Sequence, residues 1–177
     1  MAISSTYIGG GYVDIKDCTF TNFKYAMYFN QISNVNITGN TIDGTRYNGI
    51  IVAADDANYL CENITITGNT LTNISYANWD NDLYAAGISF GLNISNVTEE
   101  NNSITMLNGK PEVYYASAAK IGTEYYGTLE AALDAATDGE TVTLLKDVTL
   151  ADNTFFVLDK KITIDGNNKA VTGKTTT

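Results

Sequence analysis

The sequence predicts a solenoid of parallel β-strands, because one short phrase recurs along the chain at intervals of twenty-odd residues. Its clearest copies are Val35–Ile42 (VNITGNTI) and Ile64–Leu71 (ITITGNTL). Less exact copies are Val13–Phe20 (VDIKDCTF) and Ile162–Asn167 (ITIDGN). A unit that repeats at this interval is typical of a chain that coils around a long axis, with each coil stacked on the one before.

Within each copy, apolar and polar residues alternate, as in a strand with one buried face and one face in water. We expect Val35 and Ile37 to point into the solenoid and the strand to end at Gly39, because glycine tolerates the positive φ of a tight turn. Asn40 and Asn69 follow the glycine of their copies. We therefore expect their amides to hydrogen-bond to each other along the solenoid axis.

A second apolar pattern follows each phrase and predicts another strand in every coil. Its copies are Ala26–Phe29 (AMYF), Gly49–Val52 (GIIV) and Gly87–Phe90 (GISF). Met27 and Ile50 are 23 residues apart, which leaves room for about three short strands and their turns in one coil.

In the C-terminal third we expect a short strand at Ala119–Tyr126, followed by the chain's one predicted helix, at about residues 128–137. Thr128 is a suitable N-cap and Gly139 a suitable C-cap. Within this helix, apolar residues recur with helical spacing at Leu129, Ala132, Leu133 and Ala136. Strands resume at Thr141–Leu145 and Lys161–Ile164, again about one coil apart, with Val142 opposite Ile162.

These signals predict coils over residues 1–109, with inserted loops at about 53–60 and 73–86, and a linker over residues 110–122. Residues 123–177 then supply a capping helix and the first coils of a β-helix. Two arrangements remain open: a junction between tandem modules, or a permuted cap from a repeating array. We expect a segment of a longer protein, since neither a signal peptide nor an anchor is recognisable.

The repeated phrase, between Tyr12 and Gly91, resembles the right-handed parallel β-helix proteins, the fold of pectate lyases and many bacterial surface proteins. The string from Tyr126 (YGTLEAALDAATDGETV) is similar to the N-terminal cap of such surface proteins. The resemblance implies an all-β, right-handed parallel β-helix whose short amphipathic helix covers the open end of a coil. It also implies display by Gram-positive bacteria.

Composition argues against several function classes. The formal net charge of −10 and the sequence pI near 4.2 are unfavourable for binding nucleic acid or an anionic membrane. No apolar stretch approaches the length of a membrane span. Cys18 and Cys61 do not form a disulfide framework, and we expect both to be small buried residues.

Catalytic chemistry is not expected either, because the chain has no histidine and one arginine. The nearest approach to a catalytic pair is Asp55–Asp56, which we expect to be solvated loop residues. Neither this pair nor Asp80–Asp82 offers a full set of oxygen ligands for a metal. We therefore expect no catalytic residue, no metal and no cofactor.

The candidate binding site is the longer inserted loop, which carries the only tryptophan. Insertions in solenoids often form the binding face, and tyrosine and tryptophan are enriched where partners bind. Trp79 has an alternative role as a cover for an apolar coil edge. The candidate partner-binding residues are Tyr76, Trp79, Asp80, Asp82 and Tyr84, with Tyr47, Arg46 and Tyr59 as neighbours.

We therefore expect a non-catalytic, adhesin-like module of a secreted or cell-surface protein, whose partner is a host protein such as immunoglobulin or mucin, or a glycan. Two alternatives remain: a fragment of a polysaccharide lyase or hydrolase with its catalytic coils elsewhere, and a structural spacer. Open ends of the solenoid could also stack head to tail with another copy.

Overall fold

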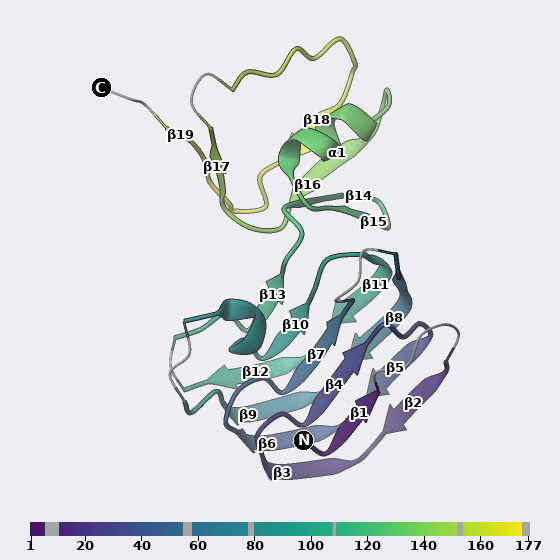
Figure 1. Cartoon of the computed structure of the whole chain (residues 1–177), viewed down its shortest axis with the longest axis vertical. Coiled ribbons are helices and arrows are strands. Elements are labelled where there is room, and N and C mark those ends of the chain that lie inside the picture. Colours follow the sequence, from purple (N-terminus) through teal and green to yellow (C-terminus); the bar gives the residue numbers. More distant parts are fainter. Residues whose placement is uncertain (6–10, 55–57, 78–79, 108, 152–153, 175–177) are drawn as a thin grey trace. The chain divides into compact units, whose positions relative to one another are not determined.

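The computed structural model divides the chain into two compact units, Met1–Ala116 and Ser117–Thr177, each described here by itself (Figure 1). The structure describes residues 1–5, 11–54, 58–77, 80–107, 109–151 and 154–174.

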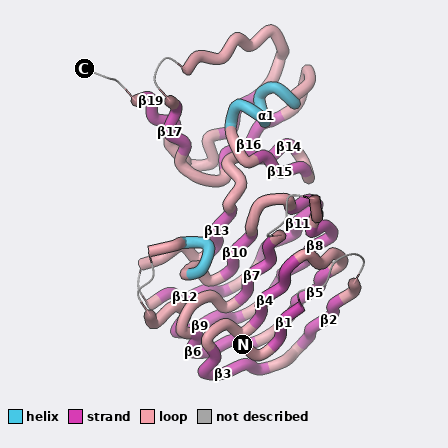
Figure 2. The backbone as a smooth tube through the Cα atoms, in the orientation of Figure 1, coloured by secondary structure: helices cyan, strands magenta, loops and turns pink. Residues whose placement is uncertain are grey.

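The first unit is a β-solenoid of three parallel sheets (Figure 2). Within the described residues it has four complete coils, each with one strand in every sheet, and a further strand, β13. Sheet A consists of β1 (Ile3–Ser5), β4 (Met27–Asn30), β7 (Ile50–Ala53), β10 (Ile88–Phe90) and β13 (Val113–Tyr115). Sheet B consists of β2 (Val13–Lys16), β5 (Val35–Thr38), β8 (Cys61–Thr67) and β11 (Ile94–Glu100). Sheet C consists of β3 (Thr19–Phe23), β6 (Thr41–Thr45), β9 (Thr70–Ile74) and β12 (Ser103–Met106).

The strand register places the repeated phrases directly on one another. Ile15 pairs with Ile37 and Ile37 with Ile66, and the last two side chains are fully buried. Sheet A is likewise in register, with Met27 opposite Ile50. The predicted alternation and the second predicted strand are therefore confirmed. Each fully buried apolar side chain of these ladders stabilises the fold by about 1.5–3 kcal/mol.

The predicted asparagine ladder is confirmed and extends one coil further. The Asn40 amide nitrogen donates to Asn69 Oδ1 at 3.0 Å, and the Asn69 amide nitrogen donates to Asn102 Oδ1 at 2.9 Å. Asn40 and Asn69 are 1% exposed. The ladder therefore satisfies polar groups that the turn between sheets B and C would otherwise bury without partners.

The prediction that both cysteines are buried is correct for Cys61 and wrong for Cys18, which is an exposed free thiol. Cys18 occupies the ladder position of the first coil, and its backbone amide donates to Asn40 Oδ1 at 3.0 Å. Only one side of this position is covered within the first unit, because β2 and β3 are the outermost strands of their sheets there. Residues at a terminal coil stay accessible even where later coils bury the same position.

The second unit begins with a hairpin and the predicted helix. Ala119–Tyr126 forms two antiparallel strands, β14 (Ala119–Ile121) and β15 (Glu124–Tyr126), because Gly122 turns the chain with a φ of +54°. Helix α1 (Leu129–Ala135) is capped by Thr128, whose side chain accepts a hydrogen bond from the Ala131 amide. Ala136 is the C-cap, so the prediction of Gly139 was wrong: the ψ of 144° at Ala136 already leads the chain out of the helix.

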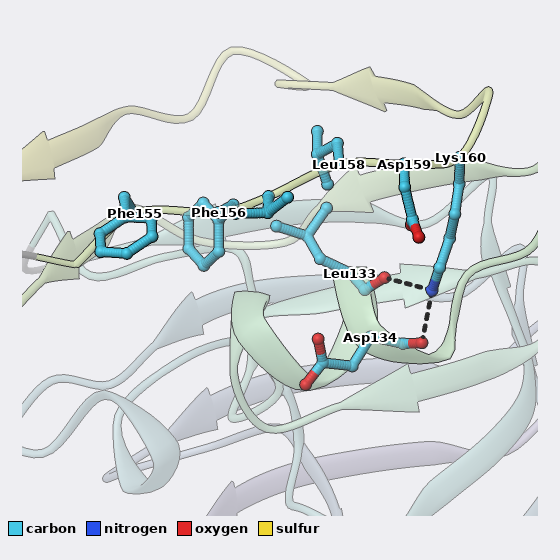
Figure 3. A pocket seen from close by; sticks show the side chains of 8 residues that line it. Leu133, Asp134, Phe155, Phe156, Leu158, Asp159 and Lys160 are labelled. Carbon is cyan, nitrogen blue, oxygen red and sulfur yellow. Dashed lines mark hydrogen bonds between the residues drawn. The ribbon is translucent and has the colours of Figure 1, made fainter.

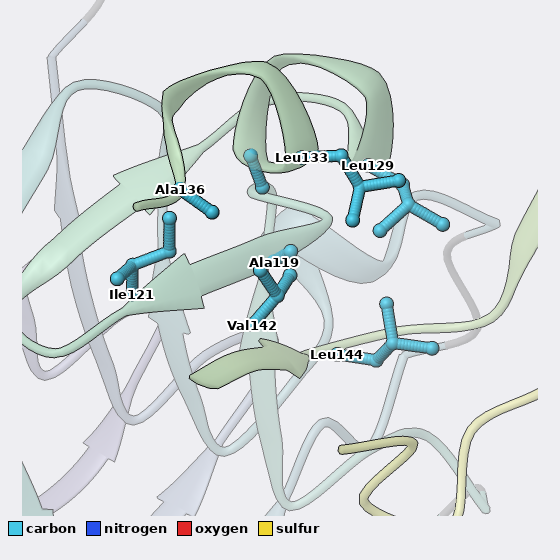
Figure 4. Packing of buried hydrophobic residues seen from close by; sticks show 8 residues of the cluster. Ala119, Ile121, Leu129, Leu133, Ala136, Val142 and Leu144 are labelled. Atoms are coloured by element: carbon cyan, nitrogen blue, oxygen red, sulfur yellow. The ribbon is translucent and has the colours of Figure 1, made fainter. Parts of the chain in front are cut away.

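The helix covers a small core of apolar residues on β14 and β16 (Thr141–Leu144) (Figure 4). Two partial coils follow, in which β16 pairs with β18 (Thr163–Asp165) and β17 (Val148–Leu150) pairs with β19 (Val171–Gly173). Val142 lies opposite Ile164 and not opposite Ile162 as predicted, so this coil is 22 residues long. The register follows the alternation, which places Val142 and Ile164 on the same face.

The segment predicted as a linker, residues 110–122, contains strands in the structure. β13 pairs with β10 and belongs to the first unit, whereas β14 belongs to the second. The two units meet in sequence between Ala116 and Ser117. Gly109 and Pro111, the single proline, favour a linker, but they are followed by Val113–Tyr115, a short β-prone stretch that pairs with β10.

Candidate functional site

Where the chain passes from sheet C back to sheet A, residues of three successive coils stack on one another. The Tyr47 amide donates to the Lys24 carbonyl at 3.0 Å, and the Ala77 amide donates to the Arg46 carbonyl at 3.1 Å. The parallel ladder thus continues around this corner, and equivalent residues of neighbouring coils lie about 4.8 Å apart. Among the described residues, the corner is formed by residues 24–26, 46–49, 75–77 and 80–87.

The side chains of neighbouring coils form two columns across this corner. In a parallel ladder an amide bonds the carbonyl that precedes its partner, so these bonds identify the residues that lie opposite one another. One column is exposed and consists of Lys24, Arg46 and Tyr76. The next column is half-buried and consists of Tyr25, Tyr47 and Ala77.

Tyrosine rings and cations are interleaved in this corner. The rings of Tyr25 and Tyr47 lie 5.3 Å apart, and Tyr28 meets Tyr25 edge-on at 6.1 Å. Lys24 Nζ lies 5.6 Å from the ring centres of both Tyr25 and Tyr47, and the Arg46 guanidinium lies 5.4 Å from that of Tyr47. These distances are within the range of cation–π attraction. We call Lys24, Tyr25, Tyr28, Arg46, Tyr47, Tyr76 and Tyr84 the tyrosine–cation surface.

The two cations of this surface have no carboxylate partner among the described residues. The ion pair that the described residues do form joins Lys16 to Asp14 at 2.9 Å, on β2 and away from this corner. Burial raises the pKa of Tyr25, and the neighbouring phenols of Tyr47 and Tyr84 raise it further, so Tyr25 stays a neutral phenol. The positive charge of the surface therefore comes from Lys24 and Arg46, although the protein as a whole is acidic.

A buried asparagine anchors the long loop beside this surface. Asn48 is fully buried, and its side-chain nitrogen donates to the Leu83 carbonyl at 3.0 Å and to Ser89 Oγ at 2.7 Å. Leu83 belongs to a 3₁₀-helix, η1 (Asp82–Tyr84). Asn48 thus ties η1 to sheet A and fixes the backbone at Tyr84.

Comparison with known proteins places this scaffold in a family. A family model described as a right-handed β-helix region matches residues 2–127. The chain belongs to the right-handed β-helix family. No curated protein and no solved structure matched the chain. Family membership accounts for the β-helix coils, but many unrelated functions occur on this fold.

Several of the predicted site residues gather at this corner of the β-helix. Arg46 and Tyr47 belong to the tyrosine–cation surface, Tyr76 is 59% exposed beside them, and Tyr84 lies near Tyr25. Asp80 is exposed in the same loop.

The other predicted residues are placed differently. Tyr59 lies in the connection from β7 to β8, at the far end of β7 from the tyrosine–cation surface. Trp79 lies outside the described residues, and so do Asp55 and Asp56. Asp82 is described in its backbone alone, as the first residue of η1.

Sequence reasoning missed Lys24, Tyr25, Tyr28 and Asn48. A signal for the first two was present, because Lys24-Tyr25 precedes Arg46-Tyr47 by 22 residues, the length of one coil. Asn48 carried no such signal, since its role depends on the loop that folds against it.

Metal and membrane chemistry are not evident in the part of the chain that the structure describes. No group of three or more histidine, cysteine, aspartate or glutamate residues there could hold a metal ion. None of the helices in those residues is long and apolar enough to cross a membrane.

Proposed function

We propose that the protein is a non-catalytic binding module and that the tyrosine–cation surface contacts its ligand. The observation that carries this proposal is the pairing of Lys24 and Arg46 with tyrosine rings, without a carboxylate partner in the described residues. Cations left available in an acidic protein favour an anionic partner, and exposed tyrosine provides rigid contact area. The β-helix backbone holds both at fixed spacing.

The chemistry of this surface favours a glycan or glycoprotein that carries acidic sugars. A tyrosine ring can pack on the apolar face of a sugar, while a guanidinium binds a carboxylate or sulfate with two parallel hydrogen bonds. A mucin-type glycoprotein offers both features, and immunoglobulin is the alternative host ligand.

We further propose that the module belongs to a large, repetitive protein displayed on the surface of, or secreted by, a Gram-positive bacterium. What supports this is the likeness of the string from Tyr126 to the caps of β-helix surface proteins, together with the low charged content of 17%. A string of this kind inside the chain also fits tandem modules.

Binding to immobilised mucin, immunoglobulin and defined acidic glycans tests the proposal. The double variant Lys24→Gln and Arg46→Gln should weaken binding about tenfold or more, since each charge-assisted hydrogen bond contributes about 1.5–3 kcal/mol. Tyr76→Ala should weaken it as well. The matched control is Lys120→Gln, which removes a cation that lies 5.9 Å from the Tyr125 ring centre in the second unit.

Two results would count against the proposal. Unchanged binding by the double variant would exclude the tyrosine–cation surface as the contact. Measurable turnover of an acidic polysaccharide by the protein would contradict a non-catalytic role and favour the alternative of an enzyme fragment.

A further inference from the structure

A small pocket lies beside the start of helix α1, within the second unit. It has a volume of about 210 Å³ and is lined by residues 127–130 and 146–149, together with Ala118. Pockets for drug-sized ligands usually have volumes of about 300–1,000 Å³, so this one suits a smaller molecule of a few carbon atoms. Three segments that are distant in sequence therefore meet around one small cavity.

Hydrogen bonds to the backbone fix the walls of this pocket. The Ala118 amide donates to the Tyr126 carbonyl at 2.8 Å, and the Leu145 amide donates to the Ala118 carbonyl at 2.9 Å. In the turn between β16 and β17, Asp147 Oδ1 accepts a hydrogen bond from the Ala170 amide at 2.9 Å. The shape of the pocket is therefore set by the fold of the second unit.

Lys146 is the one lysine among the described residues that line this pocket. It is half-buried, in the turn that joins β16 to β17. Burial lowers the pKa of Lys146, because a charged ammonium group loses part of its hydration there. At neutral pH a larger share of this amine is therefore uncharged than in an ordinary lysine, and the uncharged amine is the nucleophile.

The pocket also supplies acidic groups. Glu130, in the first turn of α1, and Asp147 both line it. A carboxylate can take a proton from the nitrogen of an amine adduct and return it to a departing hydroxyl group. Because Asp147 already accepts the hydrogen bond from the Ala170 amide, Glu130 is the better placed of the two for this role.

We propose that Lys146 is a covalent capture site for small aldehydes. The uncharged amine adds to the carbonyl carbon and forms a carbinolamine. The hydroxyl group then leaves as water, with a proton that Glu130 carries over from the nitrogen, and a C=N bond remains. Amine and aldehyde thus give imine and water, and no oxidant, reductant or further reactant is needed. The site lies in the second unit and does not depend on the tyrosine–cation surface.

Other lysines of the chain have contacts that favour the charged form. A hydrogen bond to Asp14 and the charge of that carboxylate raise the pKa of Lys16. Lys160 Nζ donates to the carbonyls of Leu133 and Asp134, at 3.3 and 2.7 Å, in the last turn of α1 (Figure 3). Bonds to the charged form of an amine make it a poorer nucleophile. We therefore expect both lysines to react more slowly than the lysine of the pocket.

Reductive trapping on the whole chain tests the proposal. The protein is mixed with a limiting amount of propanal near neutral pH, and cyanoborohydride reduces each imine to a stable amine. Peptide mass spectrometry then gives the modified fraction at every lysine. We expect Lys146 to be modified at least about threefold faster than Lys16, Lys160 or Lys169. A rate at Lys146 no higher than at these three would overturn the proposal.

The same reaction in concentrated urea shows whether the pocket is the cause. Unfolding removes the pocket, so the advantage of Lys146 over the other lysines should disappear. An advantage that is as large in the unfolded chain would assign the reactivity to the local sequence and would contradict the proposed site.

A substitution of Glu130 tests the proton transfer separately. Glu130→Gln should slow imine formation at Lys146 about tenfold or more. It should leave acetylation of Lys146 by acetic anhydride nearly unchanged, because acetate leaves without needing a proton. The matched control is Glu124→Gln, which changes an exposed acid of β15 outside the pocket. Equal slowing of both reactions, or of imine formation in the control variant, would exclude the role given to Glu130.

Discussion

The two units contain the same kind of coil in different states of closure. In the first unit Ile37 has a coil on each side and is fully buried. In the second unit Ile164 has a coil on one side within the described residues and is 46% exposed. The alternation of apolar residues decides which way a side chain points, whereas the presence of a neighbouring coil decides whether it leaves water.

The asparagines show the same contrast. Asn69 is bonded on both sides, since its Oδ1 accepts from Asn40 and its amide nitrogen donates to Asn102. Asn167 follows a glycine in the last copy of the phrase, but it is exposed, and its amide nitrogen donates to the Leu144 carbonyl at 3.1 Å. An asparagine of the ladder therefore forms more hydrogen bonds where its coil has a neighbouring coil on each side.

The largest expected difference between the units concerns buried and open aromatic residues. Phe29→Ala should lower the free energy of unfolding by about 3–5 kcal/mol, because Phe29 is fully buried and its loss leaves a cavity. Phe155→Ala, at 80% exposure, should change it by about 0.5 kcal/mol or less. Urea denaturation at low protein concentration measures both. Equal losses would contradict the contrast between closed and open coils.

The asparagine ladder provides the second comparison. Asn69→Ala should lower the free energy of unfolding by about 1–3 kcal/mol for each buried polar group left without a partner. Asn167→Gly removes one side-chain bond at an exposed turn and tolerates the φ of +45° there, so it should have a much smaller effect. The same denaturation experiment distinguishes the two variants, and a larger loss for Asn167→Gly would show that the second unit depends on its turn more than its burial implies.

The helix cap is expected to have a smaller effect. Thr128→Ala removes the acceptor for the Ala131 amide and should lower the free energy of unfolding of the second unit by about 1 kcal/mol. Circular dichroism during thermal unfolding follows this change, with Thr128→Ser as the control that keeps the hydroxyl. A cap variant as stable as the original chain would mean that α1 is held by its buried leucines alone.

The smallest expected effect is a pH dependence of stability, caused by hydrogen bonds that join two coils of the first unit. Hydrogen bonds from Thr72 and Asn73 lower the pKa of Asp43 below the ordinary aspartate value. Because the folded-state pKa is the lower one, this contribution to stability is present above the unfolded-state pKa and is lost as the pH falls through the folded-state pKa. NMR titration of the Asp43 carboxyl should show the depressed value, and Thr72→Val with Asn73→Ala should raise it towards normal. An unchanged titration in that variant would rule out this cause.

The sequence predicted those parts of the fold that the coil repeats. The phrase at Val35–Ile42 specified a strand, a turn and a buried asparagine, and the helical spacing from Leu129 specified α1. Asn102 was missed because no glycine precedes it in its turn, so the phrase is not recognisable there. The position of β13 was missed because a short strand is defined by its neighbours, which the local sequence does not contain. The strand predicted over Ala119–Tyr126 is divided by Gly122 into β14 and β15.

The candidate site was predictable in part for the same reason. Tyr76 and Tyr84 were predicted because they are aromatic residues of the long insertion, and Arg46 and Tyr47 were predicted as neighbours of that loop. Tyr59 was grouped with them by its nearness in sequence, although β7 separates it from the tyrosine–cation surface. The register between coils decides which side chains lie at the same corner. The structure gives that register, and the local sequence does not.

Hydrogen exchange followed by mass spectrometry tests the contrast between closed and open coils most directly. We predict that amides of β5, β8 and β9 are strongly protected, because each of these strands lies between two others in its sheet. Amides of Phe155–Leu158 should exchange rapidly, because no backbone hydrogen bond involves them among the described residues. Strong protection of Phe155–Leu158 would contradict the account, because it would show that this coil is already closed.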